Sequence, residues 1–173
     1  MRLMAVGLAV VLLDQLAKGW VVRQLAPGEA RAVMPGLLYI TRVHNPGAAF
    51  GLFPYQQVFL IAGTVLVLLY AWWRRRDIRR LPRGMQLAIA AGLGGAAGNL
   101  MDRVFRGAVV DFIDILVLPV FNVADIAIVT GVAVLIGYVL LGRDAPGQPE
   151  GAGGPSGSGS PDGAKAPEGH RGA

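Results

Sequence analysis

Five aspartates lie inside or beside long apolar stretches of this chain, where a lipid environment would disfavour charge. They are Asp14, Asp102, Asp111, Asp114 and Asp125. A carboxylate at membrane depth costs about 2.5 to 3.5 kcal/mol on insertion scales, and such residues usually face a bundle interior or a wet cavity. The pattern therefore indicates a functional site that works by carboxylate chemistry near a membrane.

Asp111 and Asp125 are expected to form a pair. Asp111 lies between two apolar stretches, and Asp125 lies about one turn into the second. If the first stretch ends near Asp102, the connecting loop can fold back and bring Asp111 beside Asp125. Two neighbouring carboxylates do not both ionise easily, so one keeps a proton while the other activates water. Such a pair predicts aspartic-protease chemistry, and its pKa values belong to the pair.

Two asparagines are placed to support this chemistry. Asn122 precedes Asp125 by three residues, so on a helix it shares a face with Asp125 and its amide is expected to orient that carboxylate. Asn99 and Asp102 are also three residues apart, with Arg103 adjoining. An arginine there would pair with an acid or grip a carbonyl or phosphate in bidentate fashion.

Three other acids have competing interpretations. Asp14 and Lys18 are four residues apart in the order that favours a helical ion pair, and a structural pair is favoured over catalysis. Asp102 is a rival for the second catalytic position. Its neighbour Arg103 would keep it ionised and unable to share a proton, which favours Asp111. Asp114 is interpreted as a solvated loop acid.

The composition sets the class of protein that carries these residues. Hydrophobic residues make up 54% and charged residues 16%, whereas a soluble domain has about 25% charged residues. We expect a polytopic membrane protein. The net charge of +5 does not indicate nucleic-acid binding, because six arginines lie together between residues 74 and 83. The absence of cysteine excludes disulfides, thiolate metal sites and a cysteine nucleophile.

Four spans are predicted, at about 3–25, 55–73, 85–101 and 121–141, each near the length of about 20 residues that a helix needs to cross a bilayer. The third is rich in alanine and glycine, which lets helices approach closely, so it is expected at the bundle centre. The arginine-rich loop is predicted to be cytoplasmic, which places both termini in the cytoplasm and loops 26–54 and 102–120 outside.

The loops and ends complete the expected organisation. Leu37 to Val43 is strand-like and flanked by turn residues, which predicts a small outer hairpin. Residues 1–142 are expected to form one membrane domain, and residues 143–173 a disordered cytoplasmic tail rich in Gly, Pro, Ser and Ala. A cleaved signal peptide ending near Ala30 to Ala32 is the weaker alternative, because Asp14 and Lys18 interrupt its apolar run.

Five sequence blocks occur in an order that resembles one known family. They are DQLAK from Asp14, NPGAAF from Asn45, GGAAGNLMDR from Gly94, VVDFI from Val109 and FNVAD from Phe121. Together they resemble the lipoprotein signal peptidase family, signal peptidase II, over about Asp14 to Leu141. No single block is specific, but the ordered set is.

The resemblance implies an all-α membrane protein with four transmembrane helices, a small extracytoplasmic β-cradle and an outer lid. It implies a monomeric aspartyl endopeptidase of the bacterial cytoplasmic (inner) membrane that is sensitive to globomycin. The substrate would be a diacylglyceryl-modified prolipoprotein, cut on the N-terminal side of the lipidated cysteine among membrane lipids. No metal, cofactor or nucleic acid is implied.

The resemblance also assigns roles to residues. Asp111 and Asp125 would be the catalytic pair. The residues that would bind substrate or support the pair are Asn45, Asn99, Arg103 and Asn122, and those with structural roles are Asp14, Lys18, Asp102 and Gly47. Two features depart from the family pattern: Pro46 biases Asn45 towards extended geometry, and the stretch from Gly51 to Gln57 is short for a lid helix.

A protein of another class is a rival to the peptidase. In a small proton-coupled transporter or channel subunit, Asp14, Asp102 and Asp125 would form a relay across the bilayer, which requires acids at several depths. Here only Asp14 lies well within a span, whereas the others gather near one side, as a site at one interface requires. An inactive lipoprotein-binding or chaperone homologue is a third possibility, although both candidate catalytic acids are present.

Overall fold

The computed structural model describes residues 2–47 and 56–141 of the 173-residue chain. Its elements, in chain order, are α1 (Arg2–Gln24), β1 (Ala30–Met34), β2 (Leu38–Asn45), α2 (Gln56–Trp73), α3 (Arg75–Ile78), α4 (Arg83–Arg106), β3 (Val109–Asp114) and α5 (Val123–Leu140). The tail expected from residue 143 and residues 51–55 of the expected lid lie outside the described residues.

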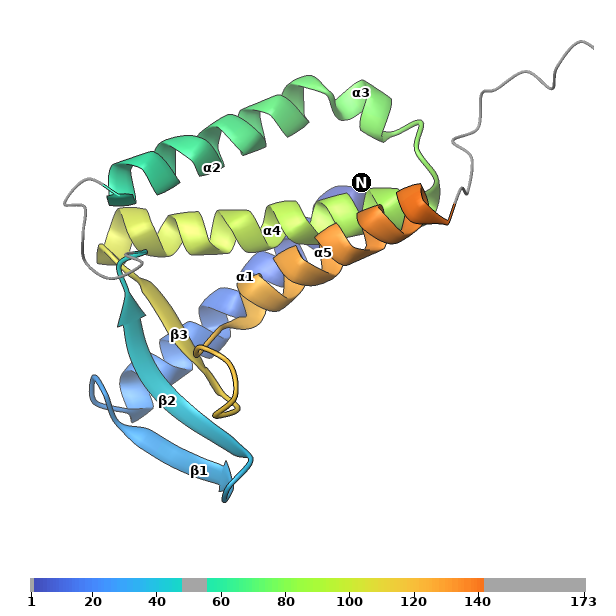
Figure 1. The fold of residues 1–173 in the computed structure, drawn as a ribbon. Coiled ribbons are helices and arrows are strands. Elements are labelled where there is room, and N and C mark those ends of the chain that lie inside the picture. Colours follow the sequence, from blue (N-terminus) through green and yellow to red (C-terminus); the bar gives the residue numbers. More distant parts are fainter. Residues whose placement is uncertain (1, 48–55, 142–173) are drawn as a thin grey trace, which may run out of the picture.

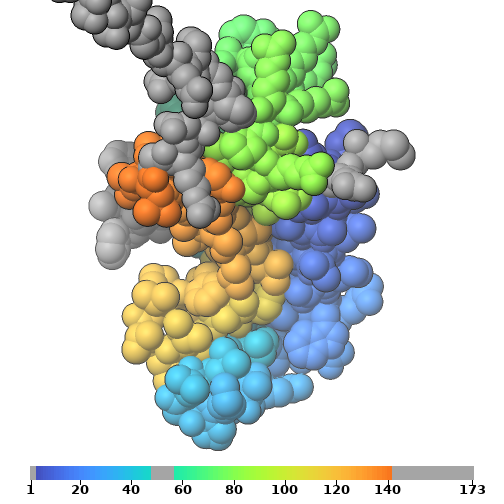
Figure 2. All heavy atoms as spheres, turned by 90° about the vertical axis from the view of Figure 1, so that its right-hand side faces the viewer, coloured from blue at the N-terminus to red at the C-terminus, as the bar shows by residue number. Residues whose placement is uncertain are grey.

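The long helices form a bundle around α4, which contacts α1, α2 and α5. The N-terminal end of α1, α3 and the end of α5 lie at one end of the molecule, and the sheet lies at the other (Figure 1). In the view turned by 90°, β1 and β2 (blue to cyan) again lie away from the start of α4 (green) (Figure 2). The bundle therefore separates the arginine-rich segment from the sheet.

The long helices lie at the predicted positions, but α4 is longer than predicted. It continues to Arg106 instead of ending near residue 101, and it stops at Gly107, whose φ of 75° provides a left-handed helix end. Apolarity ends near Asp102, yet the helix continues because the polar side chains of its last turn find partners inside the bundle. An apolar pattern does not reveal such a turn.

Two of the described helices are long and apolar enough to cross a membrane by length and composition, namely Leu3–Gln24 and Val123–Leu140. Gln57–Trp73 is a shorter apolar helix. These findings agree with three of the predicted positions, and crossing of the membrane by all four long helices stays a prediction.

Small residues allow the close helix crossings. A Cβ atom on Gly94 would lie 2.5 Å from the carbonyl oxygen of Gly7 in α1, and one on Gly95 would lie 2.4 Å from that of Ala124 in α5. Either distance is too short for a real contact. The prediction that the small-residue helix is central to the bundle is confirmed.

The strands form one antiparallel sheet in the order β1-β2-β3. The strand predicted at residues 37–43 is confirmed as β2, which pairs with β1 and places Val43 opposite Asp111 of β3. The register shifts between Ile40 and Val43. Although the molecule is mostly helical, this sheet is the element that carries Asp111.

An apolar core fixes the sheet to the bundle. Val21 of α1 and Leu25, which directly follows α1, pack with Val110 and Phe112 of β3. Arg42 of β2 adds a polar contact, because its guanidinium donates to the carbonyl oxygens of two residues at the end of α1, at 3.1 and 2.8 Å. A cation is favourable at the negative end of a helix dipole, so the core and this contact together hold β3 beside α1.

Candidate active site

Asn122 lies between the two candidate catalytic aspartates. It is the N-cap residue of α5, its side-chain oxygen accepts from the backbone N–H of Asp125 at 2.9 Å, and its own backbone N–H donates to Asp125 Oδ2 at 3.2 Å. Its Nδ2 donates to Asp111 Oδ1 at 2.6 Å. The structure thus brings Asp111 of β3 and Asp125 of α5 to one asparagine.

The way in which Asn122 holds Asp125 differs from the prediction. The spacing predicted a shared helix face and a contact between the amide and the carboxylate. Instead Asn122 is extended, with φ −134° and ψ −179°, and precedes the helix. The reciprocal contact is a capping box, in which the backbone N–H of Asn122 reaches the Asp125 carboxylate, and its amide nitrogen remains for Asp111.

Asn45 holds the other side of Asp111. Its Nδ2 donates to Asp111 Oδ2 at 2.9 Å, and its Oδ1 accepts from the backbone N–H of Gly47 at 2.8 Å. Gly47 has a φ of 81°, a left-handed conformation that favours glycine. The extended geometry expected for the residue before Pro46 is confirmed, because Asn45 ends β2.

Burial raises the pKa of the Asp111 carboxyl above its ordinary value, and the negative charge of Asp125 raises it further. The hydrogen bonds from Asn45 and Asn122 and the charge of Lys18 act in the opposite direction, because they favour the ionised form. The net effect is a raised pKa. Asp111 is therefore suited to keep a proton at a pH at which a solvated carboxyl would lose it.

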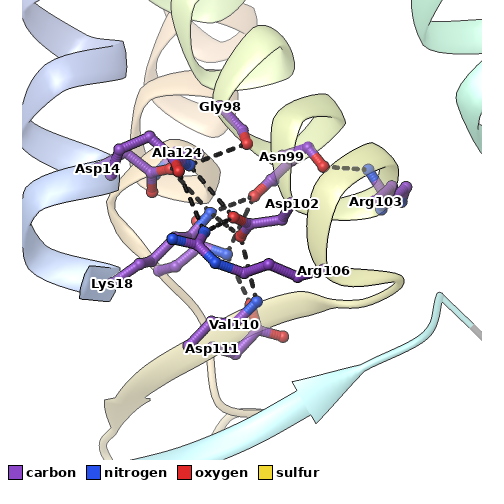
Figure 3. A network of polar contacts seen from close by, with 12 residues as sticks. Asp14, Lys18, Gly98, Asn99, Asp102, Arg103, Arg106, Val110, Asp111 and Ala124 are labelled. Carbon is purple, nitrogen blue, oxygen red and sulfur yellow. Dashed lines mark hydrogen bonds and ion pairs between the residues drawn. The ribbon is translucent and has the colours of Figure 1, made fainter. Parts of the chain in front are cut away.

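A buried ion cluster lies next to this pair. Lys18 Nζ is 2.8 Å from Asp14 Oδ2 and 2.8 Å from Asp102 Oδ2, and all three side chains are fully buried. The same nitrogen donates to Asn99 Oδ1 at 2.8 Å. An ammonium group has three N–H donors, and each has a partner here. The predicted pair of Asp14 with Lys18 is confirmed as part of a larger cluster (Figure 3).

The cations that pair with Asp102 differ from the arginine that the sequence indicates. Arg103 was expected to keep Asp102 ionised, but Arg106 and Lys18 make the ion pairs. Residues four apart on a helix share a face, whereas adjacent residues do not. The backbone N–H of Val110 also donates to Asp102, at 3.2 Å, so Asp102 holds the start of β3.

Asn99 connects the ion cluster to the pair. Its Oδ1 accepts from Lys18 at 2.8 Å and from Asn122 at 3.2 Å, while its Nδ2 donates to Asp125 Oδ1 at 2.8 Å. The spacing predicts that Asn99 shares a helix face with Asp102. In the structure, Asn99 lies between Lys18, which also pairs with Asp102, and Asp125.

Sequence reasoning missed two residues of the cluster. Gln15 Nε2 donates to Asp14 and Asp102, each at 3.2 Å, and to the carbonyl oxygen of Gly98 at 3.1 Å. Arg106 donates to Asp102 and, at 3.1 Å, to Gln15 Oε1. The spacing of four between Asp102 and Arg106 could have identified the arginine. No pattern identified Gln15.

Arg103 and Asp114 lie apart from the pair. Arg103 Nη1 donates to the carbonyl oxygen of Asn99 at 3.5 Å, and its side chain is directed away from Lys18 (Figure 3). Its Nε is buried without a hydrogen-bond partner among the described residues. Asp114 accepts from Thr41 at 2.9 Å across the sheet, so it fastens the end of β3 instead of lying free in a loop.

The acids gather at one place. Asp14, the deepest acid in the sequence, accepts from the backbone N–H of Ala124 at 2.9 Å, next to Asp125. A relay across a bilayer would need acids at separate depths. The acids of the ion cluster and of the pair do not have that arrangement; they are Asp14, Asp102, Asp111 and Asp125. Within residues 2–47 and 56–141, no three His, Cys, Asp or Glu side chains are grouped to hold a metal ion.

Comparison with known proteins identifies the family of the chain. The family model described as signal peptidase (SPase) II matches residues 6–141, which is most of the chain. The chain belongs to the signal peptidase II family. This family consists of peptidases, and membership supports the removal of signal peptides from prolipoproteins.

Relatives in the signal peptidase II family cover most of the chain. The lipoprotein signal peptidase of Syntrophomonas wolfei is 43% identical over 147 residues, which cover 82% of this chain and 94% of that protein. That of Moorella thermoacetica is 39% identical, covering 86% and 99%. A bacterial membrane enzyme solved by the in meso method has a TM-score of 0.76 and 32% identity, covering 80% of this chain and 92% of its own.

Proposed function

We propose that the protein is a membrane aspartyl endopeptidase that cuts diacylglyceryl-modified prolipoproteins on the N-terminal side of the lipidated cysteine. One observation carries the proposal: Asn122 donates to both candidate carboxylates, through Nδ2 to Asp111 and through its backbone N–H to Asp125. An asparagine in this position keeps two acids close to each other although their charges repel. The family of the chain supports the substrate class.

The chemistry follows from a pair that shares one proton. The ionised carboxylate takes a proton from water as the water oxygen bonds to the scissile carbonyl carbon, and the protonated partner donates to the carbonyl oxygen. When the carbon–nitrogen bond breaks, the protonated carboxyl gives its proton to the leaving amine, and one hydroxyl of the tetrahedral intermediate returns its proton to the other carboxylate. The pair then again carries one proton. The raised pKa of Asp111 supports a state with one proton, and the pair is described by shared pKa values.

The position of the pair suits a lipid-anchored substrate. Asp111 lies in β3 and Asp125 in the first turn of α5, and that end of α5 faces the sheet and not the arginine-rich segment (Figure 1). If that segment is cytoplasmic, both termini are cytoplasmic and the pair lies near the outer face of the bacterial cytoplasmic membrane. A lipidated prolipoprotein would approach through the bilayer and present its peptide bond where water is available. In this proposal Asn45, Asn99 and Arg103 face the substrate or steady the pair.

The test is cleavage of a diacylglyceryl-modified prolipoprotein by the purified full chain in detergent. Asp111→Asn and Asp125→Asn should each lower kcat by about 10² to 10⁴-fold, the range that a general acid or base contributes. Asp102→Asn is the matched control at an acid outside the pair and should act mainly on stability. The unlipidated precursor should stay intact, and globomycin should inhibit.

Two outcomes would contradict the proposal. Cleavage that persists in folded Asp111→Asn but disappears in equally folded Asp102→Asn would move the pair to Asp102 and Asp125. A folded wild type that leaves the lipidated substrate intact would overturn the peptidase, and proton-flux measurements in vesicles would then be required.

A further inference from the structure

The segment between α2 and α4 holds a concentration of positive charge that the peptidase site does not use. Among the described residues, Arg74 alone of its six arginines pairs with a carboxylate, at 3.1 Å from Asp77. The others are Arg75, Arg76, Arg79, Arg80 and Arg83, and all are exposed. Like charges this close repel one another, so the segment is complementary to an anion.

Aromatic rings flank these arginines. Trp72 and Trp73 at the end of α2 are 64% and 67% exposed. The guanidinium carbon of Arg75 lies 4.4 Å from the centre of the Trp72 ring, and that of Arg74 lies 5.8 Å from Trp73. Tryptophan prefers the level of lipid headgroups, so arginines in contact with these rings are suited to meet a lipid headgroup.

An apolar cleft of about 330 Å³ opens beside Arg74, where α2, α3 and α4 meet. Apart from Arg74 and Asp77, its lining residues are Val67, Tyr70, Ala71, Ile78, Leu81 and Ile89. A second cleft of about 290 Å³ shares Val67 and follows α2 to Phe59. Taken together, the α2 residues that line one cleft or the other recur every three or four positions, so they form one stripe along the helix.

We propose that this end of the molecule binds one anionic phospholipid. Its phosphodiester lies on Arg74, which lines the cleft, and on the adjoining exposed Arg75, Arg76 and Arg79, and one acyl chain enters the cleft between α2 and α4. Guanidinium groups match phosphate oxygens in bidentate geometry. The mostly apolar lining of the cleft suits an acyl chain. The headgroup charge distinguishes this occupant from an apolar helix of another protein, which has no anion to offer the arginines.

The proposal is independent of peptidase activity, because lipid binding is measured without substrate. The purified full chain in a neutral detergent is titrated with phosphatidylglycerol and with phosphatidylcholine of identical acyl chains, and bound lipid is counted by native mass spectrometry. Phosphatidylglycerol should bind at least about tenfold more tightly, since each arginine near the surface favours an anionic lipid. Inorganic phosphate at the same concentration should not compete.

Charge-matched variants locate the site. Arg75→Gln with Arg76→Gln should weaken phosphatidylglycerol binding by about 30-fold, at about 1 kcal/mol per arginine. Arg23→Gln with Arg31→Gln removes the same charge at the sheet end and should leave binding unchanged. Ala71→Phe fills the cleft and should weaken phosphatidylglycerol binding while every arginine remains.

Several results would overturn the proposal. Equal binding of the two lipids would mean that the site recognises only an apolar chain and not the headgroup charge. Equal losses of phosphatidylglycerol binding in the Arg75/Arg76 and Arg23/Arg31 double variants would mean that the lipid is held by general charge attraction. Competition by inorganic phosphate would make this an anion site without an acyl chain, and unchanged binding in Ala71→Phe would exclude the cleft. Thermal midpoints without lipid identify misfolded variants, and Arg79→Gln with Arg80→Gln replaces the first pair if it does not fold.

Discussion

Lys18 Nζ lies 2.8 Å from Asn99 Oδ1, and this contact fixes which end of the Asn99 amide faces Asp125. A lysine ammonium has donors only, so the amide oxygen must face Lys18 and the amide nitrogen must face the carboxylate, where it donates at 2.8 Å. A buried charge in α1 therefore orients a hydrogen bond to an acid of α5 that it does not touch.

Replacing Lys18 by methionine should destabilise the protein by about 3 to 5 kcal/mol, the cost of removing one partner from a buried ion pair. Asp14 and Asp102 would remain buried with less compensation. Thermal or denaturant unfolding in detergent measures the loss. Adding Asp14→Asn removes one buried negative charge and should recover part of it. A single variant as stable as wild type would show that the cluster does not hold the bundle.

Asn122 has two roles that different substitutions should separate. Asn122→Ser keeps a side-chain acceptor for the backbone N–H of Asp125, but its shorter side chain loses the amide donor to Asp111 and adds no charge. Asn122→Ala loses both, and loss of an N-cap typically costs about 0.5 to 2 kcal/mol. The expected result is little cleavage by either variant, with Asn122→Ser more stable than Asn122→Ala. Normal cleavage by Asn122→Ser would show that the bridge to Asp111 is dispensable.

Most of the bundle could be predicted from sequence because apolar stretches and small residues report burial directly. The end of α4 could not, since Arg106 is polar and its place in the helix depends on the buried Asp102. The same limit explains why the sequence indicates Arg103 as the partner of Asp102: adjacency is visible in a sequence, whereas the helix face that meets α1 becomes visible only when α1 is placed.

The candidate site was predictable in its residues but not in its connections. Asp111, Asp125 and Asn122 were identified from type and spacing, and the structure places Asn122 in contact with each of the two acids. Their geometry depends on Asn122 being a helix cap instead of a helix residue, which a spacing of three does not decide. The link from Lys18 through Asn99 joins α1, α4 and α5, and no local pattern encodes a contact among three helices.

Gly94 and Gly92 should respond in opposite directions to alanine. A Cβ on Gly94 would lie 2.5 Å from the Gly7 carbonyl oxygen, whereas a Cβ on Gly92 would meet nothing within 4 Å. Gly94→Ala should cost about 1 to 3 kcal/mol through overpacking, and Gly92→Ala should gain up to about 1 kcal/mol from helix propensity. The free energies of unfolding of the two variants in detergent test this prediction. Equal changes in the two free energies would mean that the α1–α4 crossing tolerates a methyl group.

The stability of Asp111→Asn relative to wild type should depend on pH. Because the pKa of Asp111 is raised in the folded protein, the folded state holds this proton more tightly than the unfolded state does. The stability that Asp111 contributes is therefore complete below its ordinary pKa and is lost as the pH rises through the raised value. Asparagine does not titrate, so the variant should gain on wild type across that window. A constant difference would contradict the raised pKa.

Removing the Asn45 amide should move the pH–rate profile in a defined direction. The Asn45 donor favours the ionised form of Asp111, so Asn45→Ala should raise the pKa of that carboxyl further. If the active pair carries one proton, the alkaline limb of kcat/KM marks its loss and should shift to higher pH. Thr41→Val is the matched control, because it removes a donor from Asp114 in the same sheet and should leave the limb in place. A shift to lower pH in Asn45→Ala would mean that the limb reports another group.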